Sequence, residues 1–257
     1  MVYEALSGVG DLERKRIEEA LARMDQRILG RVSDWDPALG WLSNAEAEHK
    51  RRPFHAIVAR ANPNRNSAVL EVDDIDETNP LWKCRTEITV PRVARDMADA
   101  VGSLLRIGRE IVFVDPYFSP DKPRYRNSLR EFLCIVLADR IQVQPTRIEV
   151  HTSDRLGADW FADECKRLLP PLIPRGLSVR FVQWRQRQSG EKLHNRYILT
   201  DIGGVSFHSG LDEGEPGETD EISLMDAEAY RFRYDQYAGG SPAFDLVGDV
   251  VVQGAKE

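Results

Sequence analysis

A histidine, an arginine and an aspartate lie at close spacing in the last third of the chain. The segment Leu193–Asp201 reads LHNRYILTD, so Arg196 follows His194 by two positions and Asp201 follows Arg196 by five. An imidazole can act as a nucleophile or a general acid, and a guanidinium can bind two oxygens of a phosphate at once. The pattern therefore predicts chemistry on a phosphate ester.

The elements around this segment must hold the imidazole and the guanidinium together. We expect a strand over Leu193–Leu199, because the run is apolar and β-rich. Side chains alternate along a strand, so His194 and Arg196 are predicted to share one face, with Asn195 and Tyr197 on the other. An imidazole and a guanidinium would then point the same way.

The wider motif resembles a known family. The spacing His-x-Arg-x4-Asp, followed by Gly203-Gly204 and Ser209-Gly210, resembles the pattern His-x-Lys-x4-Asp with a trailing Gly-Ser-x-Asn of the phospholipase D superfamily. The run Ile111–Phe118 (IVFVDPYF) resembles the strand and turn that open a unit of that fold. The resemblance begins near residue 93. Arg196 stands where the family has lysine, the trailing segment reads HSGLD, and the chain carries one copy of the motif.

The resemblance implies a metal-independent phosphodiesterase without a cofactor. In that family the histidine of one motif attacks phosphorus to form a phosphohistidine, and the histidine of a second motif protonates the leaving oxygen. Mapped onto this chain, His194 is nucleophile or acid and Arg196 is the phosphate ligand. Asp201 would orient an imidazole or hold the local hydrogen-bond network. Three further residues complete the expected site: Ser209 as a phosphate-side donor, and Asp115 and Tyr117 at its edge.

The single motif also bears on partners. A second histidine is needed, so we expect a two-fold symmetric homodimer in which His194 of two copies face each other. Nucleic acid is expected in preference to lipid, and DNA in preference to RNA; the family's habits suggest bacterial restriction or defence against phage. Basic stretches over 122–130 and 180–196 are candidates to contact phosphates, with aromatic residues between them to stack on bases: Tyr125, Phe181, Trp184 and Tyr197.

Composition bounds the class of protein. The 257 residues are 42% hydrophobic and 30% charged, which excludes collagen-like, coiled-coil and wholly disordered chains. No run of apolar residues is long enough to span a membrane, and the first residues lack the layout of a secretory signal, so we expect a cytoplasmic protein with no membrane contact. The three cysteines are far apart, which argues against disulfides and a zinc site, and no metal is expected.

The acidic residues are unevenly distributed. The chain has a formal net charge of -7, yet the segment from Asp212 to Glu228 holds eight acids and no lysine or arginine. The remainder of the chain is therefore close to neutral, and a local basic groove is allowed. We expect the acidic segment to be a loop that gates or shields this groove by mimicking an anionic substrate.

Strands and helices alternate over 81–257, which predicts an α/β domain whose central mixed sheet is covered by helices on both faces. The predicted helices span 93–107, 128–137 and 157–169, and the predicted strands span 110–114, 147–151, 177–182, 193–199 and 204–207. Residues 1–80 are predicted to form an extension whose contacts, a partner protein among them, stay open. It would contain a helix over 11–29, a second helix with Pro37 in its first turn, and an antiparallel hairpin of 54–59 with 67–72.

Two other classes of function stay open at this point. A degenerate module would keep the fold and bind nucleic acid or regulate a partner without turnover, with arginine in place of lysine as its first sign. A metal-dependent nuclease would have to use Asp115, Glu149 and Lys192. Hydrolysis that survives EDTA and is lost in His194→Ala would separate the phosphodiesterase from both.

Overall fold

The computed structural model describes residues 10, 12, 15, 16, 19, 33–83, 85–138, 140, 144–240 and 242–255. The chain divides into two compact units, residues 1–32 and residues 33–257. Only five residues of the first unit are described, so the helix predicted over 11–29 lies mostly outside the described residues. The domain boundary predicted at residues 80 and 81 stays a prediction.

The second unit begins with α3 (Trp41–Arg51), β1 (Ile57–Ala59) and β2 (Val69–Glu71). The predicted second helix is confirmed, but it starts after Pro37, which lies in a turn. The predicted hairpin is wrong, because β1 and β2 pair in parallel. The connecting loop folds back on itself: Asn62 Nδ2 donates to the Asn66 carbonyl at 2.9 Å, and Asn66 N donates to Asn62 Oδ1 at 2.8 Å. The loop therefore returns the chain to the starting end of β1.

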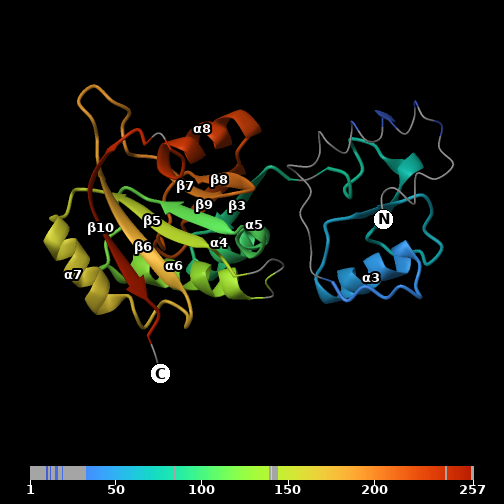
Figure 1. The fold of residues 1–257 in the computed structure, drawn as a ribbon, viewed down its shortest axis with the longest axis horizontal. Coiled ribbons are helices and arrows are strands. Elements are labelled where there is room, and N and C mark those ends of the chain that lie inside the picture. The colour runs from blue at the N-terminus through green and yellow to red at the C-terminus, as the bar shows by residue number, and fades with distance from the viewer. Residues whose placement is uncertain are drawn as a thin grey trace. The chain divides into compact units, whose positions relative to one another are not determined.

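The centre of the second unit is an eight-stranded mixed sheet with the order β10-β6-β5-β4-β7-β8-β9-β3 (Figure 1). Strands β4, β5 and β6 are mutually parallel, and every other neighbouring pair is antiparallel. The α/β class and the mixed sheet are thus confirmed. The strands are β3 (Glu87–Pro91), β4 (Glu110–Val114), β5 (Arg147–Ser153), β6 (Ser178–Arg185), β7 (Arg196–Thr200), β8 (Gly203–Phe207), β9 (Thr219–Leu224) and β10 (Asp245–Gln253).

Helices cover both faces of this sheet, as predicted (Figure 1). One core lies beneath α4 (Ala94–Ala100), α5 (Gly102–Ile107), α6 (Pro123–Leu137) and α7 (Ala158–Leu168), and a smaller core lies beneath α8 (Ala227–Tyr237). Phe113 and Val112, neighbours in β4, are both buried but belong to different cores, because side chains alternate along a strand. Among the described residues, no helix is both long and apolar enough to cross a membrane.

Several elements differ from the prediction. The helix expected over 93–107 is interrupted at Val101, where ψ is 6°. Helix α6 begins five residues earlier than expected, with Pro123 in its first turn, where a missing N–H costs nothing. The prediction did not include β3, β9, α8 or β10. Strand β9 lies inside the acidic segment, so the expectation of one continuous loop over 212–228 is wrong.

A buried polar cluster lies under α8. Trp184 Nε1 donates to His151 Nδ1 at 3.0 Å, and His151 Nε2 lies 2.9 Å from a carboxylate oxygen of Glu149. Because Nδ1 accepts a hydrogen bond, the proton of the neutral ring is on Nε2, which donates to Glu149. Glu149 is also paired with Arg147 and Arg180, at 2.8 and 3.1 Å. Complete burial lowers the pKa of His151 despite its acidic neighbour.

This cluster predicts how stability depends on pH. In the unfolded chain a histidine takes up a proton near pH 6.5, whereas folded His151 resists protonation. The free energy of unfolding should therefore be largest above that pH and fall below it, by up to about 1.4 kcal/mol per pH unit. Urea denaturation from about pH 7.5 to about pH 5 measures the slope. Trp184→Phe frees Nδ1 for a proton and should flatten the slope; equal slopes in both chains would contradict this assignment.

Candidate functional site

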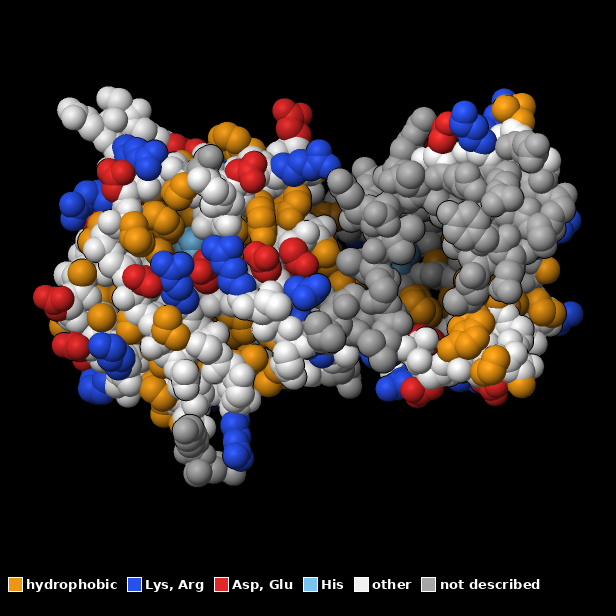
Figure 2. Space-filling view, in the orientation of Figure 1, with side chains coloured by type: hydrophobic (Ala, Val, Ile, Leu, Met, Phe, Trp, Pro, Cys, Tyr) orange, Lys and Arg blue, Asp and Glu red, His pale blue; other side chains and the backbone are white. Residues whose placement is uncertain are grey.

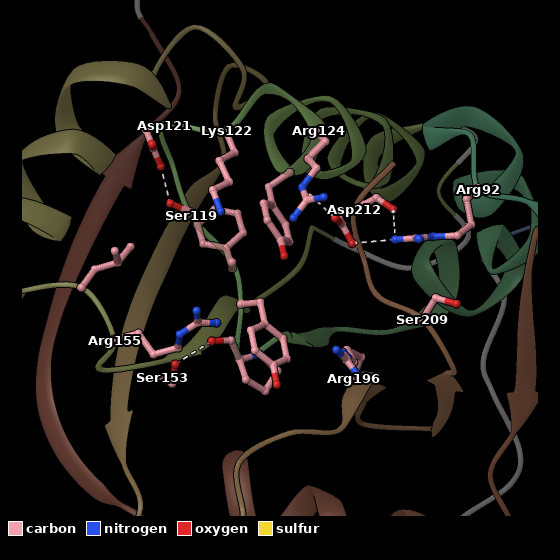
Figure 3. A pocket seen from close by; sticks show the side chains of 15 residues that line it. Arg92, Ser119, Asp121, Lys122, Arg124, Ser153, Arg155, Arg196, Ser209 and Asp212 are labelled. Atoms are coloured by element: carbon pink, nitrogen blue, oxygen red, sulfur yellow. Dashed lines mark hydrogen bonds and ion pairs between the residues drawn. The ribbon is translucent and has the colours of Figure 1, made fainter. Parts of the chain in front are cut away.

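A cavity of 560 Å³ opens at one edge of the eight-stranded sheet (Figure 3). Its wall comes from the loops that follow β4 and β5, together with Arg92 after β3, Arg196 at the start of β7, and Ser209 and Asp212 after β8. The parallel strands β4 and β5 end, and the antiparallel strand β7 begins, at the same side of the sheet. The topology therefore brings the loops after β4 and β5 close to Arg196. We call this the basic cavity, because five lysines and arginines line it and only two acids do.

Arg196 is the first residue of β7 and lines the basic cavity. Its guanidinium carbon lies 4.8 Å from the centroid of the Tyr117 ring, a cation–π contact that leaves its N–H groups available. Arg196 Nε is buried and has no hydrogen-bond partner among the described residues. A buried, unpaired donor on a permanent cation is costly, and a bound anion would satisfy it.

His194 lies two residues before β7 begins and is exposed. The prediction that His194 and Arg196 share one face of the same strand is therefore wrong in detail, because β7 begins only at Arg196. The Nδ1 atom of His194 lies 3.3 Å from the carbonyl oxygen of Lys192. His194 lines a second cavity, of 520 Å³, and Arg196 lines both cavities. The imidazole of His194 and the guanidinium of Arg196 thus line the same cavity, and Arg196 connects it with the basic cavity.

The second cavity also contains His208, which was not among the site residues predicted from the sequence. His208 directly follows β8 and is exposed. Strands β7 and β8 are antiparallel neighbours with Arg196 opposite Phe207, so the start of one lies beside the end of the other. The short connection between the predicted strands 193–199 and 204–207 favours an antiparallel pair. This spacing is a sequence signal that could have indicated that His208 lies near Arg196.

Asp201 lies at the opposite end of β7 from His194. Its carboxylate accepts hydrogen bonds from the backbone N–H groups of Arg109 and Glu110, at 2.7 and 3.2 Å. At about 3.3 Å per residue, the five residues of β7 separate it from His194 by roughly 16 Å. Within one chain Asp201 therefore does not orient the imidazole of His194. It holds the start of β4, which corresponds to the second of the two expected roles.

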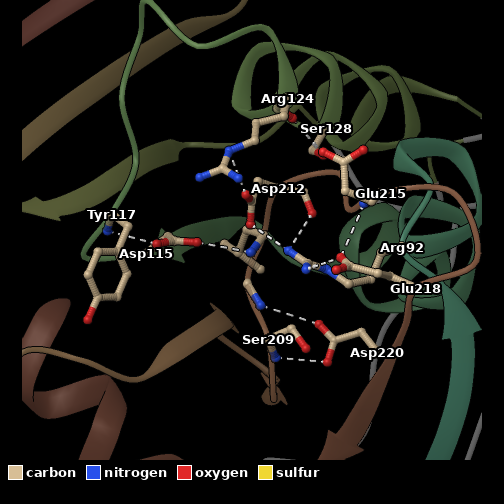
Figure 4. Close-up of polar contacts among 12 residues, drawn as sticks. Arg92, Asp115, Tyr117, Arg124, Ser128, Ser209, Asp212, Glu215, Glu218 and Asp220 are labelled. Carbon is tan, nitrogen blue, oxygen red and sulfur yellow. Dashed lines mark hydrogen bonds and ion pairs between the residues drawn. The ribbon is translucent and has the colours of Figure 1, made fainter.

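Ser209 lines the basic cavity and is positioned through its backbone. Asp220, on β9, is buried and accepts hydrogen bonds from the N–H groups of His208, Ser209 and Gly210, at 3.1, 2.9 and 3.4 Å (Figure 4). A buried carboxylate that accepts several backbone donors fixes the course of a loop. The segment that carries Ser209 is thus anchored by an acid of the acidic segment.

Asp115 joins the loop after β4 to the loop after β8 (Figure 4). Its two carboxylate oxygens accept from Tyr117 N at 2.8 Å and from Leu211 N at 2.9 Å. The side chain is buried, and burial raises its pKa to about 6, against the effect of these two hydrogen bonds. Asp115 therefore lies behind the cavity wall, whereas Tyr117 is in the wall and 39% exposed.

The acidic segment is tied to the site by ion pairs. Asp212 is buried and paired with Arg92 at 2.9 Å and with Arg124 at 3.0 Å, and Arg92 also contacts Glu218 at 2.8 Å (Figure 4). These acids neutralise two of the five cations of the basic cavity. The gating or shielding role expected for the acidic segment stays a prediction.

The basic stretches contribute in part, because Lys122, Arg124 and Arg196 line the basic cavity. In β6 and the residues after it, three arginines pair with acids: Arg180 with Asp249, Arg185 with Asp154, and Arg187 with Asp245. On the face that Figure 2 shows, acidic and basic side chains are interspersed rather than separated. The four aromatic residues expected to stack on bases are buried, although Tyr125 borders the basic cavity and Tyr197 the second cavity; the other two are Phe181 and Trp184.

The acids required for a metal-dependent nuclease do not come together. Asp115 follows β4 at the face covered by α6, whereas Glu149 lies beneath α8 with His151. Lys192 is exposed in the loop before β7. Among the described residues, no group of three or more histidines, cysteines or acids is placed to hold a metal ion.

No model of a known protein family matches this chain, and no curated protein matches it either. Function is therefore inferred from the site itself.

The packing around Gly210 predicts how sensitive the site is to substitution. An added Cβ at Gly210 would overlap with Asp212 Oδ1, which is held by Arg92. Gly210→Ala should displace Asp212 and lower the free energy of unfolding by about 1–3 kcal/mol, the cost of leaving buried polar partners unpaired. Gly157→Ala is the matched control, because no described atom lies within 4 Å of its added Cβ. Urea denaturation of both variants measures the difference; equal losses would contradict the role assigned to this packing.

Proposed function

We propose that this protein is a metal-independent phosphodiesterase of the phospholipase D type that cleaves nucleic acid, DNA in preference to RNA. The observation that carries the proposal is the partly buried guanidinium of Arg196, whose Nε atom has no hydrogen-bond partner among the described residues; Arg196 lines the basic cavity and shares the second cavity with the exposed imidazole of His194. A fixed cation with a free donor is suited to bind a phosphate, and an accessible imidazole is suited to attack it.

The proposed reaction has two steps. A ring nitrogen of His194 attacks phosphorus, an N–P bond forms, and the P–O bond to the leaving strand breaks while a second imidazole donates a proton to that oxygen. Water then attacks phosphorus, the second imidazole takes its proton, and the N–P bond breaks to free His194. Arg196 binds the non-bridging oxygens and stabilises the charge that develops on them. Arginine keeps this role in place of lysine because it is always charged and binds oxygens in pairs.

The second imidazole defines the assembly. We propose a homodimer in which His194 of a second copy supplies it, because the chain carries a single His-x-Arg-x4-Asp motif and the histidine of that motif is exposed. His208, in the same cavity as His194, is the competing source within one chain. The nuclease type suggests restriction or defence against phage, with the first eighty residues as a candidate surface for a partner protein.

The second candidate function is a module that binds nucleic acid or regulates a partner without turnover. The surroundings of His194 favour this second function. The imidazole is exposed, and its polar contact is with a backbone carbonyl at 3.3 Å rather than with an acid that would orient it. In this case the basic cavity would bind a phosphate strand, but no N–P bond would form.

Hydrolysis of bis-p-nitrophenyl phosphate in excess EDTA tests the proposed reaction. The unmodified chain should release nitrophenol, and His194→Ala and Arg196→Ala should each lower the rate about a hundredfold to ten-thousandfold, because the nucleophile or the stabilising cation is lost. His55→Ala, at an exposed histidine outside the site, serves as control. No turnover in the unmodified chain, together with retained binding of DNA, would favour the binding module instead.

Heterodimers test the source of the second imidazole. We expect sedimentation to show a dimer, and heterodimers of the unmodified chain with His194→Ala, isolated with two different tags, to be nearly inactive because only one imidazole remains in the shared site. Homodimers carrying the same two tags give the reference rate. A heterodimer with half of the reference rate would mean that each chain is complete by itself, and His208→Ala would then be expected to abolish the reaction.

A further inference from the structure

Two arginines flank one tyrosine ring in the wall of the basic cavity. The guanidinium carbon of Arg155 and that of Arg196 each lie 4.8 Å from the centroid of the Tyr117 ring. Arg155 comes from the loop after β5, and Arg196 comes from the start of β7. Figure 3 shows the two arginine side chains on opposite sides of the lower part of the cavity. They are far apart in the sequence, so only the fold brings them together.

Neither of these arginines has an acidic partner among the described residues. The acids of the wall are already engaged: Asp212 with Arg92 and Arg124, and Asp121 with the hydroxyl of Ser119. Asp154, next to Arg155 in sequence, is paired with Arg185 at 2.6 Å. Arg196 interacts electrostatically with the buried carboxylate of Asp115 but forms no ion pair with it, and its buried Nε atom has no hydrogen-bond partner among the described residues.

The ring between the arginines is held in place from both sides. Tyr117 N donates to Asp115, and Ser153 Oγ donates to the carbonyl oxygen of Pro116 at 2.6 Å, which ties the loop after β5 to the loop after β4. Stacking on a fixed ring restricts each guanidinium without using its N–H donors. The two cations are therefore preorganised at a separation no larger than twice their distance to the ring.

We propose that Arg155 is a second phosphate subsite, so that the ligand of the basic cavity is a polynucleotide strand and not an isolated diester. One phosphate binds Arg196, where the proposed hydrolysis takes place, and the neighbouring phosphate of the same strand binds Arg155, with Tyr117 as the spacer. The upper limit on the separation of the two guanidiniums, set by their distances to the ring, is compatible with binding of successive phosphates of one strand. A lipid diester with one phosphate would occupy only one of the two. This inference rests on the proposed function, whose substrate it narrows.

Fluorescence anisotropy with a labelled deoxythymidine decamer, measured at several salt concentrations in EDTA, tests the subsite. Arg155→Gln should weaken binding by about threefold to tenfold, and it should lower the slope of log affinity against log salt by about 0.7, the contribution of one phosphate contact on a single strand. Arg167→Gln is the matched control, because Arg167 is an exposed arginine paired with Glu164 near the far end of α7. It should change neither quantity.

A second variant tests the role of the ring. Tyr117→Leu removes the surface that holds both guanidiniums and should weaken decamer binding more than Arg155→Gln, whereas Tyr117→Phe keeps the ring and should bind like the unmodified chain. The subsite is overturned if Arg155→Gln and Arg167→Gln give the same affinity and salt slope, or if the unmodified chain does not bind the decamer.

Hydrolysis of bis-p-nitrophenyl phosphate, which has a single phosphate, reports on the proposed reaction alone. Decamer binding that depends on Arg155 without any turnover would keep the subsite and reject the phosphodiesterase. Turnover of the single diester with no dependence of decamer binding on Arg155 would keep the phosphodiesterase and reject the subsite.

Discussion

The carboxylate of Asp115 holds together two loops that are ninety-six residues apart in the chain. One of its oxygens accepts from the loop that carries Tyr117, and the other accepts from the loop that presents Ser209 and Asp212. The rest of the cavity depends on this bridge, because the ring of Tyr117 in turn contacts Arg155 and Arg196. Because Asp115 is buried, water does not compete for its two hydrogen bonds, and the same burial makes its charge costly.

A second constraint explains how an acidic protein keeps a basic cavity. The acids of this region are used internally: Asp212 compensates two arginines, and Asp220 accepts four backbone N–H groups. Their charge therefore holds loops in place, and little of it projects into the opening. The sign of the local field is set by the cations that are left over, Lys122, Arg155 and Arg196. Net charge is thus a poor guide to what the cavity attracts.

The sequence was sufficient for the central strands and insufficient for the periphery. Strands such as β4 are continuous apolar runs buried on both faces, a pattern that can be read locally. Helix α8 is fastened by tyrosine hydroxyls instead, Tyr230 to the Thr200 carbonyl and Tyr234 to Glu110, and such contacts have no local signature. The loop between the parallel strands β1 and β2 is likewise held by side-chain hydrogen bonds between Asn62 and Asn66.

The site divides in the same way. The proximity of His194 and Arg196 follows from two positions of spacing and was predictable, although the strand begins later than expected. Arg155 and His208 reach the same neighbourhood only through sheet topology, so neither is marked in the sequence. The aromatic residues chosen for stacking are strand or helix residues that point into the cores. Tyr117, in a loop, is the one left in the cavity wall with a substantial exposed surface.

Asp201 shows how a motif residue can matter without meeting a ligand. Its carboxylate holds two backbone N–H groups at the point where the chain enters β4, the strand that leads directly to Asp115 and Tyr117 at its other end. A genetic screen that scores only loss of function would rank Asp201 beside His194 and Arg196. The three residues of the motif would then look like one catalytic unit, although the third, Asp201, holds the start of β4 in place.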